Sequence, residues 1–144
     1  MAFGYCFNYE EELFYRDQWI VVCDNFKPDY VFDRNPPSDM NEDFYYSWTP
    51  VVSIEDALTK ANEFSLTPVL IQPLNAQVIK GTISLVDYVH PLNALYIFGD
   101  DNGGYLESDY GIQDKVYVPS LNQSVTYWSF QTGCMVTYDR MSKQ

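Results

Sequence analysis

The chain has 144 residues, 47% of them hydrophobic and 17% aromatic, and its 8 lysines and arginines against 20 aspartates and glutamates give a formal net charge of −12. This length is typical of one domain with its own core, so we expect a single domain over residues 1–144, with residues 1–50 as its least regular part. No stretch approaches the roughly 20 apolar residues of a membrane span, and the acidic N-terminal region lacks the basic start of a signal peptide, so a soluble, cytoplasmic protein is expected.

The first third of the chain is expected to combine short regular elements with a long loop. Residues 10–16 are compatible with a short helix, and the continuous apolar run at residues 19–23 is typical of a buried strand. From residue 24 to residue 50, repeated Pro, Asn, Asp and Ser break every pattern, which predicts a long irregular loop that carries many aromatic side chains. Loops this long inside a compact domain are usually functional or mobile.

The remainder of the chain alternates helical and strand-like patterns. Ser53 precedes apolar residues at helical spacing, and Asp56 stands at the capping-box offset, so a helix is expected to begin here. Residues 68–73, 94–98 and 115–118 have strand character, residues 79–89 fit either state, and residues 122–141 predict a long C-terminal helix. Such alternation is typical of an α/β domain with a mostly parallel sheet flanked by helices.

Two of the expected strands run directly into turns of small residues. Residues 94–98 are followed by a turn with three glycines, and residues 115–118 are followed by Pro-Ser-Leu-Asn-Gln-Ser. In α/β proteins, ligands bind outside the carboxyl ends of strands, where glycine lets the backbone come close to the ligand. The segments 99–104 and 118–124 are therefore expected to form two walls of one site.

The ordered pair of turns resembles two segments of the SPOUT class of RNA methyltransferases, in its SpoU-like branch. The first segment of that family reads F-G-x-E-x-x-G and the second reads I-P followed by S-L-N-x-S, and the likeness extends over residues 84–141. The matching residues are Phe98, Gly99, Gly104, Pro119, Ser120, Leu121, Asn122 and Ser124, with Asp101 in place of the family's Glu.

The resemblance implies a C-terminal trefoil knot, in which the last helix passes through a loop, and a homodimer that buries part of that helix. It implies methyl transfer from S-adenosylmethionine to RNA, to a ribose 2′-oxygen, with no metal. The cofactor-binding residues that it implies are Gln72, Pro73, Leu74, Phe98, Gly99, Gly104, Tyr117, Val118 and Leu121.

The chain departs from the family pattern in its expected catalytic groups. The family's N-terminal motif, a strand, an Asn-rich turn and a helix that carries a catalytic Arg, has no clear counterpart after residues 19–23, so Arg34 or Arg140 would have to assist deprotonation of the ribose. Asp101 is one methylene shorter than Glu, a change in reach that matters where catalysis depends on positioning. The catalytic residues implied by the resemblance are Asp101, Asn122, Ser124 and Arg34.

The net charge leaves two functions open. An acidic chain repels RNA at long range, and its basic residues are scattered singly, so either a basic partner protein supplies the RNA-binding surface or the substrate is not a long nucleic acid. The alternative is a non-catalytic SPOUT-fold dimer that binds S-adenosylmethionine or acts as a protein-interaction module, with the aromatic loop within residues 24–50 as its binding surface. A purely structural acidic protein would require both turns to be coincidence.

The remaining reactive side chains are expected to be structural. His90 is the only histidine, and no sequence signature supplies the orienting partner that a general base needs, so we interpret it as structural or solvent-facing. Cys6, Cys23 and Cys134 are odd in number and widely separated, which predicts free thiols and neither a disulfide nor a zinc site.

Overall fold

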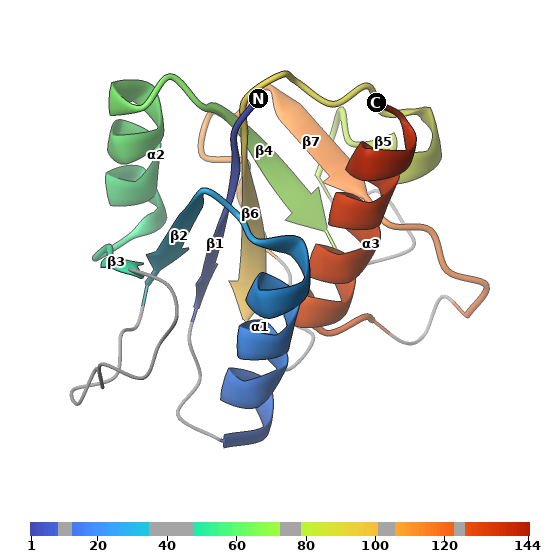
Figure 1. Cartoon of the computed structure of the whole chain (residues 1–144). Helices are drawn as coiled ribbons and strands as arrows, with labels where there is room; N and C mark the ends of the chain where they lie inside the picture. The colour runs from blue at the N-terminus through green and yellow to red at the C-terminus, as the bar shows by residue number, and fades with distance from the viewer. Residues whose placement is uncertain (9–12, 35–47, 73–78, 101–105, 123–125) are drawn as a thin grey trace.

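The computed structural model describes residues 1–8, 13–34, 48–72, 79–100, 106–122 and 126–144 (Figure 1). Within these residues, all strand pairs are parallel, and the seven strands form one sheet in the order β3-β2-β1-β6-β4-β7-β5. The elements are β1 (Phe3–Asn8), α1 (Leu13–Phe26), β2 (Tyr30–Asp33), β3 (Thr49–Pro50), α2 (Ile54–Glu63), β4 (Thr67–Gln72), β5 (Ile83–Ser84), the 3₁₀ turn η1 (Leu85–Asp87), β6 (Ala94–Asp100), β7 (Asp114–Tyr117) and α3 (Ser129–Ser142).

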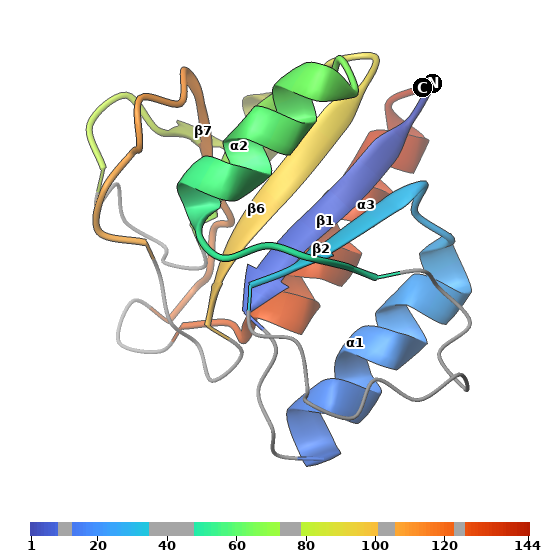
Figure 2. The ribbon, with the colours of Figure 1, turned by 90° about the vertical axis from the view of Figure 1, so that its left-hand side faces the viewer.

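Helices cover both faces of the sheet, which confirms the predicted α/β class. Helix α2 lies on one face, and α1 and α3 pack side by side on the other (Figure 2). Successive strand residues point to opposite faces, so β1, β2, β4 and β6 contribute to both cores. Cys6, Leu70 and Ile97 lie in the core under α2, whereas Tyr5 and Phe98 lie in the core under α1 and α3.

The prediction of a strand at residues 19–23 is wrong, because this run belongs to α1. Trp19, Val22 and Cys23 are buried while Val21 is 51% exposed, so the apolar residues face the sheet at intervals of three and four. The actual first strand, β1, lies inside the sheet between β2 and β6 and was not expected. The expected loop at residues 24–50 is also corrected, since it contains β2 and β3; residues 35–47 lie outside the described residues.

The later elements follow the predictions more closely. Ser53 Oγ accepts a hydrogen bond from the Asp56 N–H (3.1 Å), so the predicted cap of α2 is confirmed. Strands β4, β6 and β7 occupy the expected positions, and the ambiguous segment 79–89 contains β5 and η1. Helix α3 begins at Ser129, seven residues after the expected start; the Trp128 N–H donates to Gln131 Oε1 (2.8 Å) at this helix end.

The contact between α1 and α3 depends on one large and one small residue. The Trp19 ring is fully buried and stacks on Phe7 with ring centroids 4.2 Å apart. Gly133 of α3 faces the edge of this ring, where an added Cβ would lie 3.0 Å from a Trp19 carbon. A glycine here therefore lets the two helices approach closely. None of the described helices is long and apolar enough to cross a membrane.

Candidate functional site

The carboxyl ends of β4, β6 and β7 bring several of the predicted site residues together. Gln72 and Tyr117 are register partners at the ends of β4 and β7, and the Val118 N–H donates to Gln72 O (3.1 Å). Phe98 and Gly99 lie on β6, the other neighbour of β4, and both are buried. The strands that lead into the two expected walls, β6 and β7, therefore lie on either side of β4 and end at the same carboxyl edge of the sheet. Residues 101–104 and 123–124 of these walls lie outside the described residues.

The side chain of Gln72 ties this edge to the segment that follows β6. Its Nε2 donates to Leu106 O at 2.7 Å, and the residue is completely buried. After β7, the Tyr127 hydroxyl donates to Pro119 O (3.0 Å), while Leu121 and Asn122 are exposed. The other predicted site residues lie outside the described residues: Pro73, Leu74, Asp101, Gly104 and Ser124.

Arg34 reaches the same edge from β2. Its backbone N–H donates to Phe7 O (2.9 Å) at the end of β1, and its Nη2 donates to Phe98 O (2.7 Å) at the end of β6. Two residues that the sequence analysis assigned to one site, 64 positions apart, are thus in direct contact. Arg140, the other candidate, is buried at the opposite edge of the sheet and donates to Pro91 O (2.7 Å) and Leu92 O (2.6 Å).

Gln72 Oε1, an acceptor, and Arg34 Nε, a donor, are buried at the carboxyl edge and have no hydrogen-bond partner within the described parts of the chain. A buried polar atom without a partner costs about 1–3 kcal/mol, so native proteins rarely retain one without a reason. The acceptor lies at the end of β4, and the donor belongs to a side chain that follows β2 and reaches β6, the neighbour of β4. Together they fit a ligand that carries both an anionic group and an N–H group.

The thiol beside Arg34 is not a nucleophile at neutral pH. Burial raises the pKa of Cys6 to about 12, and the nearby Arg34 guanidinium offsets only part of this rise. Burial likewise raises the pKa of Cys23 to about 12, and the structure leaves all three cysteines as free thiols. Because the thiolate is the reactive form, neither buried cysteine supplies covalent chemistry.

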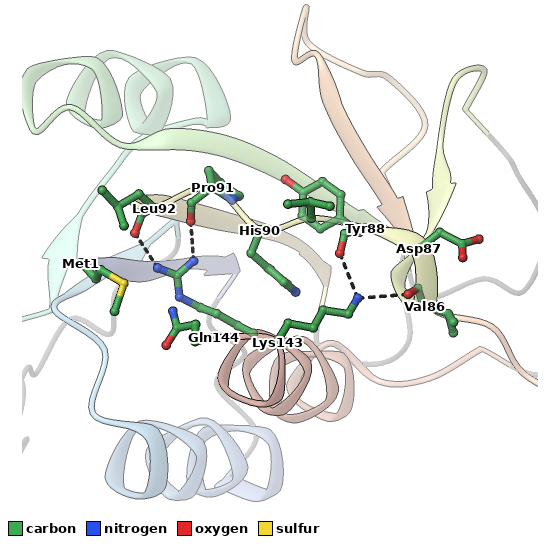
Figure 3. Close-up of a pocket in the computed structure, with 11 residues that line it drawn as sticks. Met1, Val86, Asp87, Tyr88, His90, Pro91, Leu92, Lys143 and Gln144 are labelled. Carbon is green, nitrogen blue, oxygen red and sulfur yellow. Dashed lines mark hydrogen bonds between the residues drawn. The ribbon is translucent and has the colours of Figure 1, made fainter.

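A cavity of about 530 Å³ lies at the amino edge of the sheet, between residues 86–92 and the end of α3 (Figure 3). Lys143 Nζ donates to Leu85 O (2.7 Å), Val86 O (3.1 Å) and Tyr88 O (2.9 Å). Arg140 is engaged by two further carbonyl oxygens, so both cations hold the loop that precedes β6. These contacts use the donors that an anionic ligand would need, and we interpret the cavity as structural.

His90 lies in the same region and is held from both sides. Its Nε2 is 2.7 Å from Asp139 Oδ2 and its Nδ1 is 2.7 Å from the Tyr96 hydroxyl, with 4% of the side chain exposed. The structural interpretation of His90 is confirmed and the solvent-facing alternative is wrong. Burial lowers its pKa below the usual value, although the Asp139 carboxylate acts in the opposite direction. With both nitrogens occupied, the imidazole has no free position for a substrate.

The described surface carries few available cations. Arg34, Lys60, Lys115, Arg140 and Lys143 all contact carbonyl or carboxylate oxygens. Lys27 and Lys80 are the exposed basic residues of the described chain for which no such contact is found. The surface that the structure describes therefore offers little positive charge to a polyanion.

The structure places Arg16 on a helix that directly follows β1 in the element order, an arrangement that was not expected because β1 was missed. Helix α1 begins after the carboxyl end of β1, and Arg16 is the fourth residue of this helix. The strand, turn and helix order that the sequence analysis sought after residues 19–23 is thus present earlier in the chain. The helical spacing of Trp19, Val22 and Cys23 is the sequence signal that could have revealed its helix.

Known proteins resemble this chain in structure. No protein-family model matches the sequence, and no curated protein matches it. An RNA 2′-O ribose methyltransferase matches with a TM-score of 0.76 and 12% identity over 99% of this chain and 56% of the other. The SpoU methyltransferase AviRb from Streptomyces viridochromogenes, in complex with the cofactor AdoMet, matches with a TM-score of 0.71 and 13% identity over 99% and 60%.

A third structure, which concerns 2-OH methylation of C/U34 on tRNA, matches with a TM-score of 0.66 and 10% identity over 99% of both chains. The chain thus spans about 60% of the length of the first two structures and nearly all of the third. These likenesses show that it has the fold of the SPOUT-class methyltransferases. Within that class the fold is the SpoU-like one, which confirms the resemblance that the paired turns carry.

Proposed function

We propose that this protein is an S-adenosylmethionine-dependent RNA methyltransferase that methylates a ribose 2′-oxygen. The observation that carries the proposal is the carboxyl edge of a SpoU-like fold, where β6, β4 and β7 are neighbours. The unpaired acceptor Gln72 Oε1 ends β4, and the unpaired donor Arg34 Nε belongs to a side chain that reaches β6 from β2. The cofactor would be held by Gln72, Phe98, Gly99, Tyr117 and Val118, together with the other cofactor residues expected from the sequence. A fold neighbour in complex with AdoMet supports this choice of ligand.

The chemistry requires the protein to position and activate a weakly acidic hydroxyl. When bound, the cofactor supplies a methyl group on a positively charged sulfur. The new bond joins this carbon to the ribose oxygen, the carbon–sulfur bond breaks, and the hydroxyl proton leaves to solvent. We assign Asp101, Asn122 and Ser124 to orient the reacting groups, and a guanidinium to stabilise the alkoxide as it forms.

Two arginines are candidates for that guanidinium. Arg34 is at the carboxyl edge, and Arg16 is in the first turn of the helix that follows β1. The place of Arg16 corresponds to the strand, turn and helix motif of the family, so we assign the catalytic role to Arg16. Arg16→Met should lower kcat at least 100-fold while the Kd for S-adenosylmethionine changes less than twofold, measured by single-turnover methyl transfer and by calorimetry.

The assembly and the knot of the family are part of the proposal. Tyr138 and Met141 of α3 are 69% and 57% exposed, and Val21 of the adjacent α1 is 51% exposed. These apolar side chains support a homodimer through the α1 and α3 layer. Sedimentation at micromolar concentration should give twice the 16.7 kDa chain mass, and Tyr138→Lys should shift the protein towards the monomer. We also propose the trefoil knot that the resemblance implies, in which α3 passes through a loop.

RNA binding is proposed to depend on a basic partner protein. The net charge of −12 and the engaged cations of the described surface oppose encounter with a polyanion. Methyl transfer to RNA by the isolated protein should be weak and should rise when cell extract is added. The readout is labelled methyl incorporated into total RNA, with 2′-deoxy oligonucleotides as the substrate control.

The test of the function separates it from the non-catalytic alternative. Calorimetric titration should give a single site for S-adenosylmethionine, and Gly99→Val should abolish binding because a branched side chain would occupy the expected slot. Methyl incorporation that is sensitive to Arg16→Met supports the enzyme. Cofactor binding without incorporation, with and without extract, would assign the chain to the non-catalytic module instead.

A further inference from the structure

We propose that Arg34 is an oxyanion receptor, and that the oxyanion it binds is the α-carboxylate of the methionine part of S-adenosylmethionine. The inference rests on the proposed function, because it names how this same site recognises one end of its cofactor. It also gives Arg34 a binding role in place of the catalytic role expected from the sequence.

The guanidinium of Arg34 is fixed before any ligand arrives. The backbone of Arg34 is bound to Phe7 O, the side chain passes the buried Cys6 thiol, and Nη2 donates to Phe98 O. The side chain thus extends from β2 across the end of β1 to the end of β6. A preorganised group loses little freedom on binding, which favours affinity.

Donors remain on this guanidinium. Arginine has five N–H groups, and the Phe98 carbonyl takes one of them. Nε is buried and has no hydrogen-bond partner within the described residues, and Arg34 forms no salt bridge with a described carboxylate. The completely buried Asp33 precedes Arg34 and also acts on the Cys6 thiol, so the guanidinium has a carboxylate in its surroundings. Its remaining N–H groups are the donors that a ligand acceptor would use.

The position of Arg34 favours a carboxylate over an RNA phosphate. Its guanidinium contacts Phe98, the residue at which the wall expected on the methionine side of the cofactor begins. The planar fork of arginine matches a carboxylate with two parallel hydrogen bonds. A phosphate of the RNA backbone needs an accessible cation, whereas Arg34 is half-buried and the exposed Lys27 and Lys80 belong to other segments.

The experiment compares S-adenosylmethionine with its decarboxylated form, which differs by the carboxylate alone. Calorimetry on the full chain should show that the intact protein prefers S-adenosylmethionine by about 10–100-fold, as expected for charge-assisted hydrogen bonds. Arg34→Met should abolish this preference and leave the affinity for the decarboxylated form within twofold. Arg34→Lys, which keeps the charge but loses the fork, should retain part of the preference.

Controls separate this inference from folding and from the proposed function. Lys60→Met removes the same charge near the end of α2 at the amino edge and should leave the preference unchanged. Circular dichroism melting identifies a variant that fails to fold, in which case Arg34→Lys carries the test. Binding of both ligands with the preference intact in Arg34→Met overturns the inference alone. Arg34→Met that binds the cofactor normally but binds RNA more weakly also overturns the inference, because the oxyanion would then be a phosphate. Absence of binding to either ligand by the intact protein overturns the proposed function.

Discussion

Replacing Gln72 by methionine tests whether its unpaired oxygen is kept for a ligand. Gln72→Met preserves length and removes both polar atoms of a completely buried side chain. The Leu106 carbonyl loses its donor, at a cost of about 1–3 kcal/mol, while removal of the unpaired Oε1 contributes a similar amount in the opposite direction. The free energy of unfolding should therefore change by less than about 1 kcal/mol, which urea denaturation measures.

Binding should change where stability does not. If Oε1 accepts a hydrogen bond from the cofactor, Gln72→Met loses a neutral hydrogen bond, and the Kd for S-adenosylmethionine should rise about 2–12-fold in calorimetry. Gln113→Met makes the same substitution at an exposed position just before β7 and should alter neither quantity. A variant that is destabilised by more than about 3 kcal/mol and binds the cofactor normally would refute the reasoning, because the oxygen would then serve the fold.

Three further predictions concern the scaffold. Gly4→Ala should destabilise the protein by at least about 3 kcal/mol, because the added Cβ would lie 2.7 Å from Tyr30 O. The control Gly111→Ala, in open space at φ +74°, should cost only about 1–2 kcal/mol. The urea midpoints of the two variants test this difference. Trp19→Ala should cost about 3–5 kcal/mol in the same assay, and a loss below 1 kcal/mol would contradict the buried stack. Because burial lowers the pKa of His90 in the folded state, stability should fall as pH drops below about 6.5; His90→Gln should remove this slope between pH 7 and pH 5.5.

The regular elements with local signals were predictable from the sequence. The α2 cap needs only Ser53 and Asp56, which are three residues apart, and β4, β6 and β7 are short apolar runs next to proline, glycine or polar residues. The paired turns were informative for the same reason, because each lies directly after a strand. Where residues close in sequence determine an element, the sequence pattern was sufficient to predict that element.

The early elements depend on contacts that the sequence does not reveal. The apolar run at residues 19–23 fits a strand by itself, and only the burial of one helical side against Phe7 and Gly133 makes it part of α1. Strand β1 gains its place from β2 and β6, one close in sequence and one distant. The contact between Arg34 and Phe98 joins residues 64 positions apart. This contact could be recognised only once the order of the strands in the sheet was known.

The anchors at the end of α3 impose an order on folding during synthesis. Arg140 and Lys143 hold carbonyl groups of the loop before β6 from 49 and 58 positions further along the chain. At ribosomal rates of about 5–20 residues per second, these anchors emerge roughly 2–12 s after the loop that they hold. Until then these carbonyl groups lack the donors that α3 supplies, and the segment before β6 is not fixed to that helix. A nascent chain that stalls before residue 140 should consequently remain exposed to chaperones and proteases, although every strand of the sheet has already been made.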